Sequence, residues 1–157
     1  MSEIDVRPFA KRATLSVRVK TSPAELGAVL ASIFPRVFAY AAGSGASPGQ
    51  PYVRYWGRSA EVLDIEAGLP VQKALAQKGD IIPGEIGGGS VASLEHVGPY
   101  EGLPAVHEKL AAWVKASKQR PQGPSLEIYL TDPGDEPSPE RWRTQVFEHQ
   151  GRRLSGL

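Results

Sequence analysis

The chain has 157 residues, which by length is one ordinary domain that can bury a hydrophobic core. Its 18 Lys and Arg residues nearly balance its 17 Asp and Glu residues, and this argues against a dedicated nucleic-acid binder. The absence of cysteine excludes disulfide bonds, thiolate metal sites and a cysteine nucleophile. We find no secretion signal and no apolar stretch near the roughly 20 residues that span a bilayer. We therefore expect a soluble, cytoplasmic domain that does not enter a membrane.

The first half of the chain predicts strands, one long helix and two more strands. Alternation of apolar and polar residues predicts strands over residues 3–9, 13–20, 52–56 and 61–66, the last ending before Gly68. Ser22–Glu25 matches a capping box with proline at the first helical position, so a helix is expected to begin there. Because Pro35 falls inside the apolar stripe of this helix, we expect a kink or break near residues 31–34.

The second half predicts a similar order after a weaker helical candidate at residues 71–78. Strands are expected over residues 81–86, 91–97, 126–131 and 142–149. Gly87-Gly88-Gly89 lies between the first two of them and is not followed by a helix, as a phosphate loop must be, so it is interpreted as a hairpin turn. A helix is expected over about residues 103–119. Its apolar stripe consists of Val106, Leu110, Trp113 and Val114. Residues 151–157 are expected to form a basic tail.

The two halves can be aligned with each other. When residues 49–55 are placed on residues 123–129, Tyr55 pairs with Tyr129. The common order of elements and this register favour a duplication, although any α+β chain can offer such a match by chance. A duplicated unit usually packs about a pseudo-two-fold axis, and the seam is a natural place for a ligand.

Several motifs have a recognisable pattern. They are His96–Leu103, Gly123–Pro133 and Trp142–Phe147, with Arg54–Tyr55 and Glu66–Val71 as matching pieces of the first half. Together they resemble the GyrI-like family, the small-molecule-binding domain that also serves as the effector module of AraC-type and MerR-type regulators. The resemblance covers about residues 4–149. The sequence departs from the family at Gln145 and Phe147, where an acidic residue and a tyrosine are frequent.

The resemblance implies an α+β fold of duplicated strand-helix-strand-strand units, with an antiparallel sheet and a pseudo-two-fold ligand groove. It implies a single domain over residues 1–150, with repeats at about 4–70 and 80–149. Family members bind bulky compounds that are often cationic or planar and aromatic, and some stand-alone members hydrolyse cyclopropane-bearing DNA-alkylating toxins. One namesake inhibits DNA gyrase, a role to which the near-neutral charge gives little support. Since residue 1 already starts the first strand, we expect no helix-turn-helix and no direct DNA binding, which leaves action through a separate regulator open.

Glu127 is the candidate ligand anchor, because the resemblance places the usual charged residue of the family at this position. Strand alternation puts Glu127 and Tyr129 on one face of the sheet. The residues alone leave an alternative open, in which this face is wet or Glu127 pairs with an arginine such as Arg54. The candidates for an aromatic box around the carboxylate are Tyr129, Tyr55, Tyr100 and Trp142.

A carboxylate among aromatic rings favours lipophilic cations. Desolvation raises the pKa of a buried carboxyl, a delocalised cation restores a partner, and each ring adds about 0.5–2 kcal/mol of cation–π attraction. The same groups suit a hydrolase, with Glu127 as general base and Tyr129 or Tyr100 as donor to a developing oxyanion. The sequence leaves open the choice between binder and hydrolase, the physiological ligand and the oligomeric state. We expect no metal and no cofactor, since the three histidines lack zinc-site spacing and His96 alone is thin support for haem.

Overall fold

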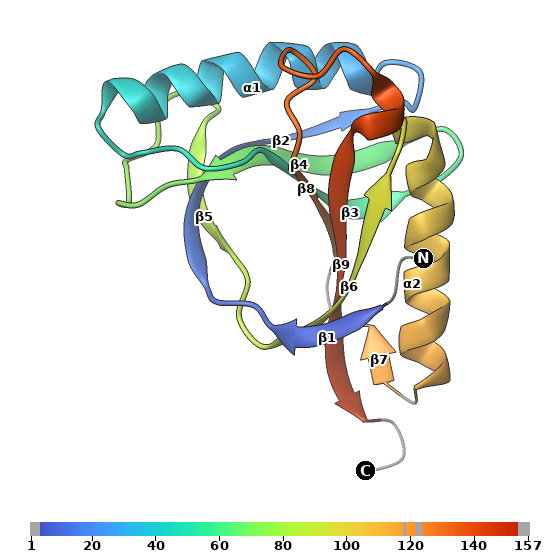
Figure 1. Ribbon diagram of the computed structural model, residues 1–157. Coiled ribbons are helices and arrows are strands. Elements are labelled where there is room, and N and C mark those ends of the chain that lie inside the picture. The colour runs from blue at the N-terminus through green and yellow to red at the C-terminus, as the bar shows by residue number, and fades with distance from the viewer. Residues whose placement is uncertain (1–3, 118, 122–123, 154–157) are drawn as a thin grey trace. The chain divides into compact units, whose positions relative to one another are not determined.

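The computed structural model describes residues 4–117, 119–121 and 124–153 (Figure 1). The internal contacts divide the chain into two compact units. One unit is continuous in sequence and consists of residues 10–88, whereas the other combines residues 1–9 with residues 89–157. We call them the continuous unit and the discontinuous unit. Both are built from antiparallel strands and one long helix, so the fold is α+β, as expected.

The continuous unit is a four-stranded antiparallel sheet with one helix. Its elements are β2 (Arg12–Thr21), α1 (Leu26–Gly43), β3 (Tyr52–Arg58), β4 (Leu63–Pro70) and β5 (Ile82–Ile86). The strands lie in the order β3-β4-β2-β5, and α1 contacts β4 and β2 (Figure 1). Ile33, Val37 and Ala41 recur at helical spacing and are the buried residues of α1, so one narrow stripe holds the helix on the sheet.

Two predictions for α1 are corrected. The capping box predicted Pro23 at the first helical position, but residues 23–25 form a turn in which the Ser22 hydroxyl accepts a hydrogen bond from the Glu25 backbone N–H at 3.2 Å, and the helix begins three residues later, at Leu26. The expected break before Pro35 is wrong, because α1 runs unbroken through this residue. Pro35 and Ala31 are both exposed, so water can bond the carbonyl group that lacks its helical partner.

The composition of α1 also bears on the expectation that the chain does not enter a membrane. The helix has 18 residues and a mean hydropathy of 1.5, so by length and composition alone it could cross a membrane. In the structure its buried residues Ile33, Val37 and Ala41 face β4 and β2, and only 17% of the helix is buried.

The discontinuous unit has its own antiparallel sheet. Its elements are β1 (Asp5–Pro8), β6 (Ser90–Val97), the 3-10 helix η1 (Tyr100–Gly102), α2 (Leu103–Ala116), β7 (Gln119–Pro121), β8 (Ser125–Tyr129), the 3-10 helix η2 (Pro139–Arg141) and β9 (Arg143–Arg153). The strands lie in the order β1-β6-β9-β8, and β7 pairs with β9. The core between α2 and this sheet contains Ala92, Leu94, Leu103, Leu110, Val114 and Val146. Residues 151–153 of the expected tail belong to β9, and residues 154–157 lie outside the described part of the chain.

The triple glycine does not form a hairpin. β5 pairs with β2, whereas β6 pairs with β1 and β9, so the strands that flank the glycines belong to different units. Gly87, Gly88 and Gly89 have φ angles of 91°, 93° and 75°, a backbone conformation that glycine adopts without a steric penalty. Nearness along the chain suggested the pairing, but β6 already has β1 on one side and β9 on the other, so β5 cannot pair with it.

Two other element predictions are corrected. Residues 71–78 are not helical, and the N–H groups of Val71 and Gln72 bond to the carbonyls of Ala13 and Ala46 at 2.9 and 2.8 Å. β4 does not end before Gly68 but continues to Pro70. A Cβ atom at position 68 would overlap the carbonyl oxygen of Leu15 on β2, so glycine permits this close pairing.

Candidate functional site

Glu127 lies on the face of its sheet that packs against α2. β8 pairs with β9 in a register that places Glu127 opposite Val146, which in turn lies opposite Leu94 on β6. Val146 and Leu94 belong to the core cluster under α2. The glutamate side chain therefore points into an apolar layer, and only 2% of its surface is exposed. The alternative of a wet face is wrong.

Both oxygen atoms of the Glu127 carboxylate accept a hydrogen bond. The Tyr129 hydroxyl donates to Oε1 at 2.7 Å, and the Nε2–H of His107 on α2 donates to Oε2 at 2.6 Å. The alternative in which Glu127 pairs with Arg54 is wrong, because the guanidinium of Arg54 bonds to Glu66 at 2.8 Å. A buried carboxylate costs free energy unless it is hydrogen-bonded, and these donors offset that cost.

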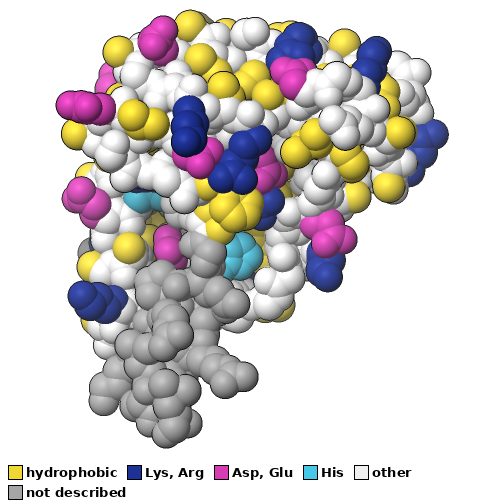
Figure 2. Space-filling model, turned by 180° about the vertical axis from the view of Figure 1, so that it is seen from behind, with side chains coloured by type: hydrophobic (Ala, Val, Ile, Leu, Met, Phe, Trp, Pro, Cys, Tyr) yellow, Lys and Arg dark blue, Asp and Glu magenta, His cyan; other side chains and the backbone are white. Residues whose placement is uncertain are grey.

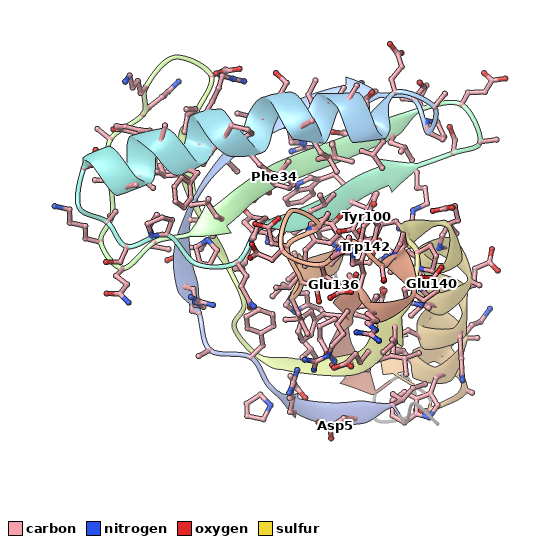
Figure 3. All side chains as sticks on the ribbon, turned by 45° about the horizontal axis from the view of Figure 1, so that its top comes forward. Asp5, Phe34, Tyr100, Glu136, Glu140 and Trp142 are labelled. Carbon is pink, nitrogen blue, oxygen red and sulfur yellow. The ribbon has the colours of Figure 1, made fainter. Side chains whose placement is uncertain are left out.

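Three aromatic rings form a row that begins at the carboxylate. The ring centroids of Tyr129 and Tyr100 lie 5.5 Å apart, and those of Tyr100 and Trp142 lie 4.8 Å apart. Figure 3 shows Tyr100 and Trp142 side by side. The indole N–H of Trp142 donates to the Glu136 carbonyl at 2.8 Å and fixes the outer ring of the row. Burial raises the pKa of the Tyr100 phenol, and the Asp132 and Glu127 carboxylates raise it further.

The turn from β6 to α2 positions Tyr100. The Nε2 atom of His96 lies 2.8 Å from the Pro99 carbonyl oxygen and ties the turn to the strand. Gly98 has a φ of 134°, which disfavours other residues, and a Cβ atom at Gly102 would come within 2.7 Å of the His96 ring. The motif at residues 96–102 is thus a compact turn that presents a tyrosine, and His96 has a structural role within it.

The structure brings four of the five predicted site residues together. Glu127, Tyr129, Tyr100 and Trp142 form one connected set in the discontinuous unit. Tyr55 lies on β3 in the continuous unit, where the guanidinium of Arg58 is 4.3 Å from the centre of its ring.

The sequence analysis missed His107 as the partner of Glu127. A signal was present, because Leu103, His107, Leu110 and Val114 recur at helical spacing and are all buried. A histidine on the buried stripe of a helix needs a polar partner in the core. A glutamate on a buried strand has the same need, and the two predicted elements pack together.

A second buried carboxylate lies in the continuous unit. Glu66 on β4 accepts hydrogen bonds from the Tyr52 hydroxyl, from the Arg54 guanidinium at 2.8 Å and from the Trp56 indole at 3.0 Å. Burial raises the pKa of Tyr52 well above its ordinary value, and the adjacent Glu66 charge adds to the effect. These bonds tie β3 to β4 and saturate the carboxylate, so we assign this cluster to stability.

Some of the charges elsewhere on the surface form ion pairs. Positive and negative side chains lie beside one another over the face shown in Figure 2. Arg18 with Asp64, Arg36 with Asp80, and Arg143 with Glu95 form ion pairs of 2.8–2.9 Å. Among the side chains that the structure describes, no group of three or more His, Asp and Glu residues is placed to hold a metal ion.

Comparisons with known proteins give a family and a fold. A family model described as GyrI-like small molecule binding domain matches residues 2–147. The chain is 16% identical to EcmrR in its cryo-EM complex with DNA, with a TM-score of 0.81, and the match covers 97% of this chain but 57% of that one. With the crystal structure of the EcmrR C-terminal domain, identity is 15%, the TM-score is 0.76, and coverage is 97% and 98%.

Two further solved structures have the same fold at lower identity. A hydrolase from Listeria innocua is 13% identical, with a TM-score of 0.67 and coverage of 95% of this chain and 92% of that one. SAV2435 bound to tetraphenylphosphonium is 8% identical, with a TM-score of 0.63 and coverage of 98% and 96%. The comparison with curated proteins gives no match.

Proposed function

The chain belongs to the family of GyrI-like small molecule binding domains, and we propose that it binds bulky lipophilic compounds, often cationic or planar and aromatic, at Glu127. Its role is then recognition, sequestration or sensing of such compounds. The tetraphenylphosphonium bound to SAV2435 is a compound of this class.

One observation carries the proposal, namely a buried carboxylate that lies beside a row of three aromatic rings. Glu127 is 2% exposed and is held by Tyr129, whose ring adjoins Tyr100 and then Trp142. In a low-dielectric layer a charge acts more strongly than in water, so a cation near the carboxylate gains more there. The rings add stacking for planar bodies and cation–π attraction for charged ones.

A common order of elements supports a role for Tyr55. Both units contain the order strand, helix, strand, strand, as β2-α1-β3-β4 and, apart from the short β7, β6-α2-β8-β9, and the strand orders β3-β4-β2-β5 and β8-β9-β6-β1 correspond. We propose that the units arose by duplication, which makes Tyr55 the counterpart of Tyr129. Tyr55 remains a candidate ligand residue on that ground, and Tyr55→Ala in the titration described next tests it.

The proposal is tested with tetraphenylphosphonium and isothermal titration calorimetry. We expect Glu127→Gln to weaken binding at least about tenfold, the change that 1.4 kcal/mol produces, because it removes the charge and keeps the shape. The matched control is Glu95→Gln, since Glu95 is a glutamate of the same unit that pairs with Arg143. Equal affinity in Glu127→Gln and in the unchanged protein would contradict the proposed site.

A hydrolase is the second candidate function, and the direct contact between Glu127 and Tyr129 favours it. Glu127 would take a proton from water as the water oxygen bonds to a cyclopropane carbon and a ring C–C bond breaks. The electron pair of that bond moves to a conjugated carbonyl oxygen, which takes the Tyr129 proton. The proton held by Glu127 then returns to Tyr129 along their hydrogen bond. A hydrolase with this fold has been solved at 13% identity.

Mass spectrometry separates the two functions. The protein is incubated with an activated cyclopropane, and the mixture is searched for a product that is heavier by one water molecule. Product from the unchanged protein but not from Glu127→Gln supports the hydrolase. Protection of the compound without any product supports the binder.

The remaining expectations follow from the same proposal. We place the protein in the cytoplasm, without direct contact with DNA or a membrane, and cell fractionation tests this. A gyrase-directed role has less support, because charges of both signs alternate over the face seen in Figure 2 and give no single-sign patch there. A pull-down with gyrase subunits tests that role.

A further inference from the structure

β2 is longer than the strand that covers one of its edges. β5 pairs with β2 from Arg12 to Ser16, and the pairing ends there. On the other side, β4 follows β2 in a continuous register as far as Thr21. Within the described part of the chain, residues 17–21 of β2 therefore have a neighbouring strand on one side and none on the other. We call this unpaired side of residues 17–21 the open edge.

The backbone groups of Arg18 and Lys20 point to the open edge. In an antiparallel sheet, successive residues of a strand direct their N–H and C=O groups to alternate sides. The Val71 N–H bonds to the Ala13 carbonyl, so the odd-numbered residues of β2 bond to β4 and the even-numbered ones point the other way. Arg18 and Lys20 thus each present one donor and one acceptor, and no backbone group of a described loop or turn bonds to them.

A largely apolar groove lies beside the open edge, between β2 and α1, which run side by side (Figure 1). Its volume is about 360 Å³, and its lining residues all belong to the continuous unit. Val17 and Val19 line it from the sheet, and Ala28, Val29 and Ile33 line it from α1. Because Ala28 is exposed, the groove is open to solvent.

We propose that the open edge binds an extended acidic peptide as an additional antiparallel strand, in which acidic and apolar residues alternate. Sheet edges bind peptides in this way through main-chain hydrogen bonds, and pockets for alternate side chains give specificity. The peptide residues opposite Val17 and Val19 lie on the same face of the sheet as these valines, so their side chains enter the groove. This inference concerns the continuous unit and does not rest on the function proposed for Glu127.

The charges around the open edge favour an acidic partner. Strand alternation places the side chains of Arg18 and Lys20 on the face of β2 opposite to the groove. The Arg18 guanidinium binds Asp64 at 2.9 Å, which leaves the exposed Lys20 ammonium without a carboxylate of its own among the described residues. An acidic residue of the peptide beside Lys20 supplies one. Glu25 lines the groove, so the side chains that enter the groove should carry no negative charge.

The same charges disfavour a second copy of this chain at the open edge. If two open edges paired with each other, Arg18 and Lys20 of one copy would face the same cations of the other copy, and like charges opposite each other are destabilising. A lysine on an edge strand is a common protection against such self-pairing. A peptide with acidic residues meets no such repulsion.

The probe is a capped peptide of about seven residues in which glutamate and valine alternate, titrated into the whole protein and followed by NMR. The interface of so short a strand is small, so we expect a weak complex with a dissociation constant below about 1 mM. Binding should move the amide signals of Arg18 and Lys20, and saturation should slow their exchange with solvent. A peptide with lysine in place of glutamate should bind at least about fivefold more weakly.

Methylation of the peptide backbone separates strand addition from binding by charge alone. In the added antiparallel strand, the glutamates bond to Arg18 and Lys20, whereas the valines direct their N–H groups away from β2. Methylating the glutamate N–H groups should therefore abolish binding, and methylating the valine N–H groups should preserve it. Equal affinity of the two methylated peptides would overturn the inference, because their charges are the same.

Variants at exposed positions test the contacts that the protein makes. Lys20→Glu should weaken binding at least about fivefold, whereas Lys73→Glu, at an exposed lysine elsewhere in the same unit, should not. Ala28→Gln places a larger side chain in the groove and should also weaken binding. Ala31→Gln is its matched control, since Ala31 is exposed on α1 and does not line the groove.

The outcomes that contradict the inference are distinct from a failure to fold, because all four substitutions are at exposed positions. Unchanged affinity in Lys20→Glu and Ala28→Gln overturns it, as do signals that move elsewhere than at the open edge. No binding at about 2 mM peptide overturns it as well. A dimer of the protein alone in sedimentation, formed through the open edge, would show that the occupant is a second copy and not an acidic peptide.

Discussion

Replacing His107 by leucine tests how the buried pair contributes to stability. The substitution leaves the Glu127 carboxylate, 2% exposed, without the 2.6 Å hydrogen bond that it receives from α2. Removing the hydrogen-bond partner of a buried carboxylate leaves its charge uncompensated, which costs about 3–5 kcal/mol. Leucine regains part of this cost, since position 107 lies on the buried stripe of α2 with Leu110 and Val114.

We therefore expect His107→Leu to lower the free energy of unfolding by about 2–4 kcal/mol. For a chain of this length, 1 kcal/mol corresponds to about 2–4 °C, so the melting temperature should fall by roughly 5–15 °C. The double variant His107→Leu with Glu127→Leu removes both partners and should be more stable than His107→Leu alone, because a buried pair can be replaced by apolar residues at little cost. Tyr129 is only partly buried, so water can replace the acceptor that it loses.

Urea unfolding followed by circular dichroism measures the four proteins of this cycle, which are the unchanged chain, the two single variants and the double variant. Losses of stability that simply add in the double variant would refute the reasoning, since contacting residues that act as a pair show an interaction energy. An unchanged unfolding midpoint in His107→Leu would refute it as well.

Two further predictions concern other ion pairs and hydrogen bonds. Tyr52→Phe leaves one buried oxygen of Glu66 with fewer donors and should destabilise the protein by about 1–3 kcal/mol in urea unfolding, whereas Tyr40→Phe at a more exposed site should cost less. The hydrogen bonds from Arg143 lower the pKa of Glu95 below its ordinary value, so this pair stabilises the protein above that value and the contribution is lost as pH falls through the lowered pKa. An NMR titration should show the Glu95 pKa rising toward its ordinary value in Arg143→Gln, and no rise would contradict the assignment.

Much of the fold could be predicted because the local patterns are clear. Strand alternation located β2, β3, β6, β8 and β9 to within a few residues, and the capping box at Ser22 placed the start of α1 three residues too early. The pairing of strands was harder, because it depends on which edges meet in space. The predicted hairpin at Gly87–Gly89 was wrong for that reason, and the helix predicted at residues 71–78, whose apolar pattern was weak, does not form.

The candidate site could likewise be predicted only where local patterns determine it. The shared face of Glu127 and Tyr129 follows from strand alternation and is confirmed by their hydrogen bond. The choice of Glu127 as anchor came from the resemblance to a family, since a buried glutamate on a strand has several explanations. His107 was visible on the stripe of α2, but only the packing of the helix against the sheet shows that it meets Glu127. The contact between Tyr100 and Trp142 joins residues 42 positions apart and has no local signal.

The place of β1 has a consequence for synthesis on the ribosome. Residues 10–88 hold every strand of the continuous unit, so that unit can assemble while the second half of the chain is still being translated. β1 emerges before the continuous unit, yet its partner β6 begins at Ser90, and the antiparallel register joins Asp5 to Ser93. β1 therefore waits for a strand that appears more than eighty residues later, and a gene fragment that encodes residues 89–157 alone yields a sheet without this edge strand.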